Sequence, residues 1–272
     1  MYAIRDYQPN SANVPSKNIL DLQPLFIFLQ VFGGQIGMPL FVGTLLFAPS
    51  VKRHLTLVNF CLSWIIYSIV YCLTIYHKED RSHGLGRRLC IAQAAMVHGV
   101  VPLACITYCT LHIQVWMAVR VAFNQTSWLQ KHKRSVLIIM FIAPYVVFIA
   151  FSVASLVVTL QHPEILDQSG AYYCTLNYDP LALSVPAFAA SIIIIMISLE
   201  VIIGIMLVRR WKYVRRHQRL NSASLSMIVR IAIFSTYGFA TLAFVTTLYT
   251  TDIEYILILM AFLTLLEHAQ HF

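Results

Sequence analysis

The feature that most constrains the fold is a series of apolar stretches of about 20 residues, each long enough to cross the ~30 Å hydrocarbon core of a bilayer as a helix. Seven such stretches occur in the 272-residue chain. They are residues 25–47, 55–76, 91–118, 136–160, 185–208, 227–249 and 253–272. Because lipid cannot satisfy free backbone N–H and C=O groups, each is expected as a helix. The sequence therefore predicts an all-α integral membrane protein, a bundle of seven transmembrane helices.

Composition agrees with this class. Hydrophobic residues make up 59% of the chain and charged residues 11%, whereas soluble domains average about 25% charged. No polar linker divides the chain, so we expect one domain over residues 25–272. The polar residues 1–24 lack the basic start and apolar run of a signal peptide, and are expected as an extracellular segment before the first helix.

The distribution of charge predicts the orientation. Lysine and arginine resist transfer across a membrane and collect in cytoplasmic loops. The loops after the first, third and fifth stretches are basic and contain no acidic residue. Their basic residues are Lys52, Arg53, Arg120, Lys131, Lys133, Arg134, Arg209, Arg210, Lys212, Arg215, Arg216 and Arg219. We therefore expect the N-terminus outside and the C-terminus in the cytoplasm. The net charge of +8 reflects these loops and gives no indication of nucleic-acid binding.

The six cysteines divide by location. Four fall inside predicted helices, and the other two, Cys90 and Cys174, lie on the predicted outer side, where disulfides form. Cys90 and Cys174 are therefore predicted to pair. The alternative is two free thiols.

Taken together, these features resemble the G-protein-coupled receptor superfamily. The resemblance lies in the seven-helix topology, Cys90 at the start of the third helix, Cys174 in the following external loop, and the basic second and third cytoplasmic loops. In detail the chain is most similar to the divergent receptors of fungi. It lacks rhodopsin-like motifs, since Arg120 has no acidic neighbour and the sixth stretch contains no proline.

The resemblance implies a plasma-membrane receptor that binds an unidentified extracellular ligand and signals through a heterotrimeric G protein. It implies no catalysis, cofactor or metal. The expected coupling residues are basic and lie at the cytoplasmic side: Arg120, Arg209, Arg210, Lys212, Arg215 and Arg216. The alternative for the same residues is binding to anionic lipids of the inner leaflet.

Ionisable residues within the apolar stretches are candidates for function, because they are costly in a bilayer. Glu200 lies in the fifth stretch and Arg230 near the start of the sixth. We expect a contact between them that could switch with movement of the sixth helix. Alternatively, a protonated Glu200 bonds to a neighbouring backbone or hydroxyl group while Arg230 reaches the lipid phosphates.

A ligand site is predicted below the disulfide. Gln93 and His98 share a helical face with Cys90, and Tyr172 and Tyr173 directly precede Cys174. These four side chains could line an outer cavity between helices. The alternative is that Gln93 and His98 simply bond to neighbouring helices.

Other functions compete with the receptor. A transporter or channel is the second hypothesis, with Glu200, His112 and Arg230 along an ion path. A zinc-dependent intramembrane hydrolase is the third, because Glu267, His268 and His271 could share a helical face. We expect those three residues instead to mark a helix end. A retinal protein is excluded for this chain, since residues 253–272 contain no lysine for a Schiff base.

Overall fold

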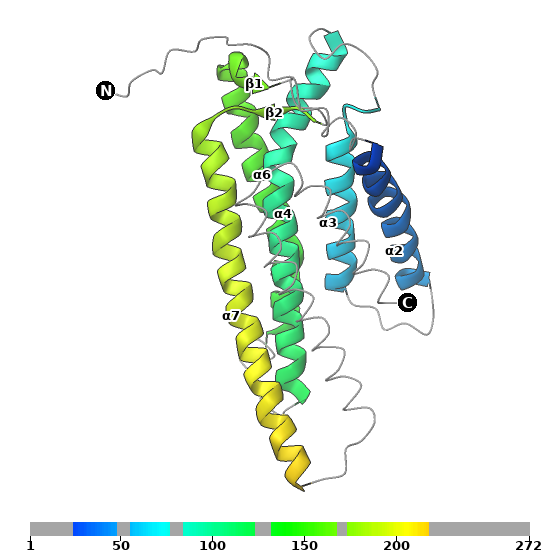
Figure 1. Ribbon diagram of the computed structural model, residues 1–272, viewed down its shortest axis with the longest axis vertical. Helices are drawn as coiled ribbons and strands as arrows, with labels where there is room; N and C mark the ends of the chain where they lie inside the picture. Colours follow the sequence, from blue (N-terminus) through cyan, green and yellow to red (C-terminus); the bar gives the residue numbers. More distant parts are fainter. Residues whose placement is uncertain (1–23, 48–54, 77–83, 123–131, 168–172, 218–272) are drawn as a thin grey trace, which may run out of the picture.

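The computed structural model describes residues 24–47, 55–76, 84–122, 132–167 and 173–217 (Figure 1). This part is almost entirely helical. The first helix, Pro24–Phe47, contains a π-helical segment η1 (Leu29–Gly37) followed by α2 (Met38–Phe47). The later elements are α3 (Leu55–Cys72), α4 (Gly84–Ala122), α6 (Lys133–Gln161), η2 (Pro163–Ile165), β1 (Leu166–Asp167), β2 (Thr175–Leu176) and α7 (Asp179–His217).

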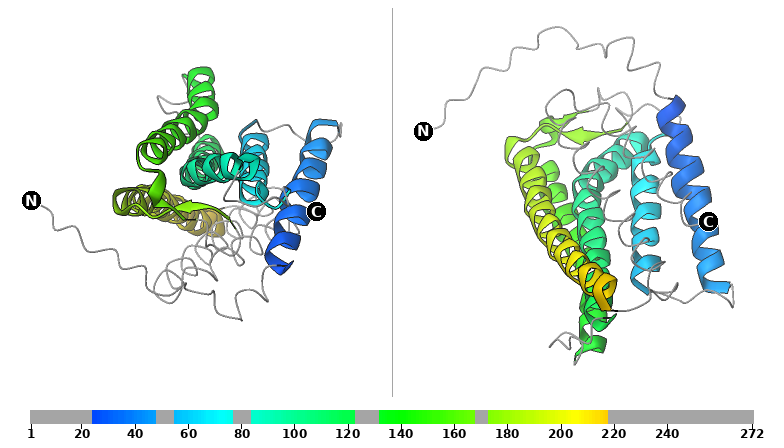
Figure 2. Two further views of the ribbon diagram at one scale, coloured as in Figure 1. Left: turned by 90° about the horizontal axis from the view of Figure 1, so that it is seen from above. Right: turned by 60° about the horizontal axis from the view of Figure 1, so that its bottom comes forward.

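Helix α4 is the centre of the bundle. It packs against α3, α6 and α7, while η1 and α2 lie beside α3 at the edge (Figures 1 and 2). Between α6 and α7, the short strands β1 and β2 pair antiparallel, with Leu166 opposite Leu176 and Asp167 opposite Thr175. The β1–β2 pair lies across one end of α4, so the connection between α6 and α7 covers that end of the central helix.

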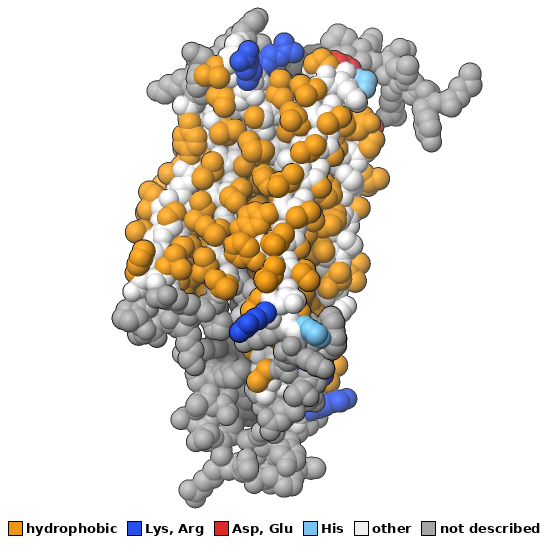
Figure 3. Space-filling view, turned by 180° about the vertical axis from the view of Figure 1, so that it is seen from behind, with side chains coloured by type: hydrophobic (Ala, Val, Ile, Leu, Met, Phe, Trp, Pro, Cys, Tyr) orange, Lys and Arg blue, Asp and Glu red, His pale blue; other side chains and the backbone are white. Residues whose placement is uncertain are grey.

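Five helices of the described part are long and apolar enough to cross a membrane. Figure 3 shows one face of the bundle, with a broad apolar band and the coloured lysine and arginine side chains only near its two ends. Helices α6 and α7 contribute many exposed aliphatic side chains, among them Ile139, Val146, Ile194 and Ile205. Such a surface suits hydrocarbon and would be unstable in water. The coarse prediction of a helical membrane protein is confirmed.

The helices and the predicted stretches differ mainly in length. Helix α4 begins at Gly84 and has 39 residues, about 58 Å at 1.5 Å per residue, and α7 is equally long. Apolar composition marks only the part that lipid can cover, whereas helical hydrogen bonding continues beyond it. The stretches at 227–249 and 253–272 lie outside the described residues, and the sidedness of the two ends stays a prediction.

Gly99 sets the distance between α4 and α6. A Cβ atom added there would overlap the Ser152 hydroxyl and lie 2.7 Å from the backbone oxygen of Phe148. Gly34 has the same role in η1, where an added Cβ would overlap Ser68 of α3. Small residues at such crossings let membrane helices approach closely.

Candidate functional site

A disulfide anchors the connection between α6 and α7. Cys90 of α4 bonds to Cys174, 84 positions later, with the Cα atoms 5.4 Å apart. Both residues are fully buried, and Ala94, Leu176 and Leu181 pack around them. The predicted pairing is present, and the alternative of two free thiols does not hold here. We call this end of the bundle the disulfide end.

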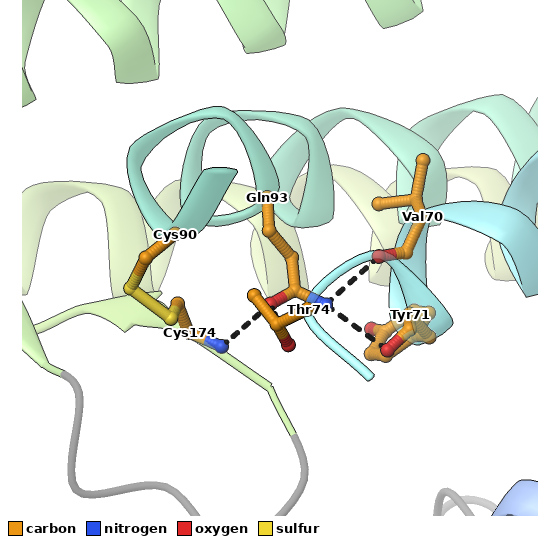
Figure 4. Close-up of a disulfide and its surroundings, with 6 residues drawn as sticks. All are labelled: Val70, Tyr71, Thr74, Cys90, Gln93 and Cys174. Atoms are coloured by element: carbon orange, nitrogen blue, oxygen red, sulfur yellow. Dashed lines mark hydrogen bonds between the residues drawn. A yellow bond between two sulfur atoms is a disulfide. The ribbon is translucent and has the colours of Figure 1, made fainter. Parts of the chain in front are cut away.

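Gln93 binds three segments together beside the disulfide (Figure 4). Its amide NH₂ donates to the carbonyl oxygens of Val70 and Tyr71, at 2.9 and 3.0 Å. Its carbonyl oxygen accepts from the Thr74 hydroxyl and from the backbone N–H of Cys174, both at 2.9 Å. Every hydrogen-bonding position of the amide is therefore used. These contacts match the alternative in which Gln93 bonds to neighbouring segments.

The other predicted ligand residues are less closely grouped. His98 lies five positions after Gln93, is buried, and its Nδ1 contacts the Ala94 carbonyl oxygen at 2.9 Å. Tyr173 packs edge-on against Tyr71, with ring centroids 4.9 Å apart. Tyr172 lies outside the described residues. The structure thus brings Tyr173 close to the segment that Gln93 holds and leaves His98 deeper in α4.

Aromatic side chains continue inward from Tyr173 along α3. Their spacing of three or four residues puts them on one face of the helix. The ring centroids are 4.6 Å apart for Tyr71–Tyr67, 5.0 Å for Tyr67–Trp64 and 6.1 Å for Trp64–Phe60. The series then crosses to α4, with Phe60 6.0 Å from Tyr108. We call this set the aromatic column; its members are Tyr173, Tyr71, Tyr67, Trp64, Phe60 and Tyr108.

The column ends at a buried ionisable pair. The Tyr108 ring lies 4.5 Å from that of His112. His112 Nε2 lies 2.9 Å from Oε1 of Glu200 in α7, and its Nδ1 lies 3.0 Å from the Tyr108 carbonyl oxygen. Both side chains are almost completely buried, at 1% and 2% exposure. Glu200 thus joins α7 to α4, and its predicted partner, Arg230, lies outside the described residues.

The sequence does contain a signal for this pair. His112 lies eight positions before Arg120, and Glu200 lies nine positions before Arg209. At 1.5 Å per residue both are about 12–13 Å from a basic residue at the same end of the bundle. Equal depth on adjacent helices could have suggested the contact, but His112 was predicted only to line an ion path.

The predicted coupling residues fall on two helices. Arg120 lies near the end of α4, with its guanidinium carbon 5.0 Å from the centre of the Trp116 ring, a cation–π contact. Arg209 lies in α7, and the helix continues through His217. The positions of Arg210, Lys212, Arg215 and Arg216 are therefore in the last turns of a helix, where we had expected a loop.

At the disulfide end, an exposed contact joins His162 to Glu164 of η2. His162 Nδ1 lies 3.1 Å from Glu164 Oε1. A backbone hydrogen bond, and then the bond from His162, lower the pKa of Glu164. Because both groups are in water, this contact adds little to stability.

Comparison with known proteins adds no assignment. No protein-family model matches the chain, and no curated protein sequence is significantly similar to it. The resemblance to G-protein-coupled receptors stays a prediction.

The described residues also hold no group of three or more His, Cys, Asp or Glu side chains placed to bind a metal ion. Glu267, His268 and His271, the candidates for zinc, lie outside them.

Proposed function

We propose that the protein is a plasma-membrane receptor with its N-terminus outside, which binds an extracellular ligand and acts on a cytoplasmic heterotrimeric G protein. The observation that carries the proposal is the aromatic column. It forms an unbroken series of ring contacts from Tyr173, next to the disulfide, to Tyr108, beside the His112–Glu200 pair.

Packed side chains of this kind can transmit a change between distant sites when an element has two arrangements. A ligand that moves Tyr173 would change the packing of Tyr71, and the change would reach α4 and α7 at the opposite end. Helices α4 and α7 are also the helices that carry Arg120 and Arg209 there. The proposal therefore joins an extracellular input and a basic cytoplasmic surface through one series of contacts.

The test is nucleotide exchange on purified G proteins. We expect the full-length protein in lipid nanodiscs to accelerate exchange on at least one Gα subunit, and Arg120→Ala to reduce that rate several-fold. Arg88→Ala is the matched control, because Arg88 lies on the same helix at the disulfide end and should leave the rate unchanged. Failure to accelerate exchange on any Gα class, or equal losses in both variants, would contradict the proposal.

A transporter or channel is the second candidate, and the buried His112–Glu200 pair is the observation that favours it. Ionisable groups inside membrane bundles often mark proton or ion paths. Flux into liposomes that contain the purified protein distinguishes the two. A transporter would move ions and lose flux in Glu200→Gln, whereas a receptor would show no flux in either form.

A further inference from the structure

Two contacts fix the register between α4 and α7. Near the disulfide, Leu181 of α7 packs in the same cluster as Ala94 of α4. Deeper in the bundle, Glu200 of α7 contacts His112, which lies 88 positions earlier in the chain. The separation in sequence is almost the same at both contacts, so the two helices run in parallel. Each residue of α4 therefore lies level with the α7 residue about 88 positions later.

Helix α7 extends beyond the end of α4. The last residue of α4 is Ala122, which is level with position 210 of α7, and α7 continues to His217. The residues after position 210 reach about 10 Å further at 1.5 Å per residue. Figure 1 shows this end of α7, in yellow, beyond the last turn of α4. We call residues 207–217 the basic extension.

The buried face of α7 continues into the basic extension as an apolar stripe. Within the bundle this face contains Met196, Glu200 and Ile203, whose side chains are at most 3% exposed. A spacing of three or four positions follows one side of a helix. The next positions with that spacing are 207, 211 and 214, and the sequence has leucine, tryptophan and valine there. Apolar residue types therefore follow this face past the end of α4.

Basic residues occupy most other positions of the basic extension. They are Arg209, Arg210, Lys212, Arg215 and Arg216, and no acidic residue accompanies them. At about 100° per residue, positions 209, 212 and 216 lie opposite the apolar stripe, and positions 210 and 215 lie at its borders. Val208 and Arg209, which lie off the stripe, are exposed. The sequence thus forms an amphipathic helix whose polar side is cationic.

A cationic amphipathic helix can bind a bilayer or a protein groove, and the direction of α7 favours the groove. An amphipathic helix that binds lipid lies flat in the interface. The basic extension is instead the unbroken continuation of an apolar spanning helix, since α7 is helical from Asp179 to His217. Only its first turn can therefore reach the lipid headgroups. Apolar anchors at i, i+4 and i+7 are the pattern that a hydrophobic protein groove recognises.

We propose that the basic extension is a docking site for a calcium-loaded EF-hand protein. In sensors of this class, Ca²⁺ opens each helix pair and exposes a methionine-rich groove, which adapts to large apolar anchors. The carboxylates of the Ca²⁺-binding loops make such proteins acidic, which complements the five basic residues of the extension. The proposal rests on the predicted cytoplasmic location of this end and does not depend on coupling to a G protein.

Calmodulin, a sensor of this class, is the probe. The full-length protein in nanodiscs of zwitterionic lipid should bind fluorescent calmodulin saturably in Ca²⁺ and not in EGTA. Trp211→Ala should weaken binding about tenfold or more, because a tryptophan anchor is a typical hot spot. No binding in Ca²⁺ would overturn the proposal, since the bilayer or another part of this chain would then cover the stripe. Equal binding in EGTA would also overturn it, because charge attraction alone would then explain the binding.

Tyr213→Ala is the matched control. It removes an aromatic residue from the same helical turn, about 200° from position 211, and should leave the Kd nearly unchanged. Equal losses in Trp211→Ala and Tyr213→Ala would contradict the assignment of the stripe. The double variant Lys212→Gln/Arg216→Gln should lower the association rate and its dependence on salt, while the requirement for Ca²⁺ stays. An unchanged association rate would contradict the charge complementarity.

If Trp211→Ala does not fold, the methionine methyl NMR signals of calmodulin test the docking with the wild-type protein. We expect those signals to shift when the nanodiscs are added in Ca²⁺, because the groove is rich in methionine. Unchanged methyl signals would overturn the proposal. Nucleotide exchange on Gα, which tests the receptor function, is measured without calmodulin, so the two proposals can fail separately.

Discussion

Gln93 is the side chain on which the disulfide end depends most directly. It is fully buried, and its four hydrogen bonds reach the end of α3 and the segment that carries Cys174. The loss of a hydrogen bond in an apolar interior is costly, because water cannot replace it there. Gln93 therefore positions both the disulfide segment and the adjacent Tyr173.

Replacement of Gln93 tests this role. We expect Gln93→Leu to lower the free energy of unfolding by about 3 kcal/mol, because four buried hydrogen bonds are lost at about 0.5–1.5 kcal/mol each. Thr74→Val is the control, because it removes one bond and should cost about 1 kcal/mol. Denaturation of both variants in the same detergent measures the difference. Equal stability of Gln93→Leu and wild type would mean that these bonds are not needed.

The partners of single buried polar side chains were the least predictable feature of the site. Glu200 was predicted to contact Arg230, which lies outside the described residues, and in the described part Glu200 contacts His112. The contact with His112 was not predicted, because the rotation of each helix about its axis depends on packing that one sequence does not reveal. Gln93 was predicted on the same helical face as Cys90, but its bonds to the Val70 and Tyr71 carbonyl oxygens and from the Thr74 hydroxyl depend on where α3 ends.

At the scale of elements, the crossing of α4 and α6 is set by glycine. Gly99 lies against Phe148 and Ser152, and the backbones approach so closely that no side chain fits between them. Helix α6 is otherwise held mainly by apolar packing and by a hydrogen bond from the Tyr145 hydroxyl to Asn59 Oδ1 at 2.7 Å. The crossing at Gly99 therefore controls how α6 meets the centre of the bundle.

A methyl group at this crossing should be destabilising. We expect Gly99→Ala to lower stability by about 1–3 kcal/mol through overpacking. Gly204→Ala in α7 is the matched control, because an added Cβ there meets no atom within 4 Å and alanine favours a helix by about 0.5–1 kcal/mol. Thermal unfolding of both variants in one detergent compares them. A Gly99→Ala variant as stable as Gly204→Ala would show that the crossing can relax.

The elements themselves were largely predictable from hydrophobicity. The first five apolar stretches correspond to described helices, because bilayer thickness fixes the length of an apolar span. Their true ends were not predictable, since Gly84 and His217 lie in polar sequence where helix formation depends on capping and contacts. The β1–β2 pair was missed for a similar reason, because two residues per strand leave no periodic pattern.

At the scale of the molecule, the arrangement implies that the two ends of the bundle face different compartments. The loops after the first, third and fifth apolar stretches are basic and contain no acidic residue, and such loops are typically cytoplasmic. Because the first of these loops directly follows the first stretch, we expect the N-terminus outside.

Accessibility of tags tests this topology. We expect an epitope tag at Met1 to react with antibody on intact cells, and a tag inserted after Asn221 to react only once the membrane is made permeable. The reason is the cluster of arginine and lysine next to Asn221, which resists translocation. A tag inserted at residues 77–83, which we also expect outside, serves as a second marker. Reaction of the Met1 and Asn221 tags from the same side would contradict either the helix count or the orientation.

Formation of the disulfide also depends on how the helices between its two cysteines are inserted into the membrane. Cys90 emerges during synthesis well before Cys174, and the rest of α4 and the whole of α6 lie between them. Once α4 has been inserted, the two thiols reach the same side of the membrane only if α6 crosses it as well. A chain in which α6 failed to enter the bilayer would leave Cys174 on the opposite side and both thiols reduced. Because we expect the disulfide end to face the oxidising side of the membrane, we also expect a reduced Cys90–Cys174 pair to mark chains in which α6 has not been inserted.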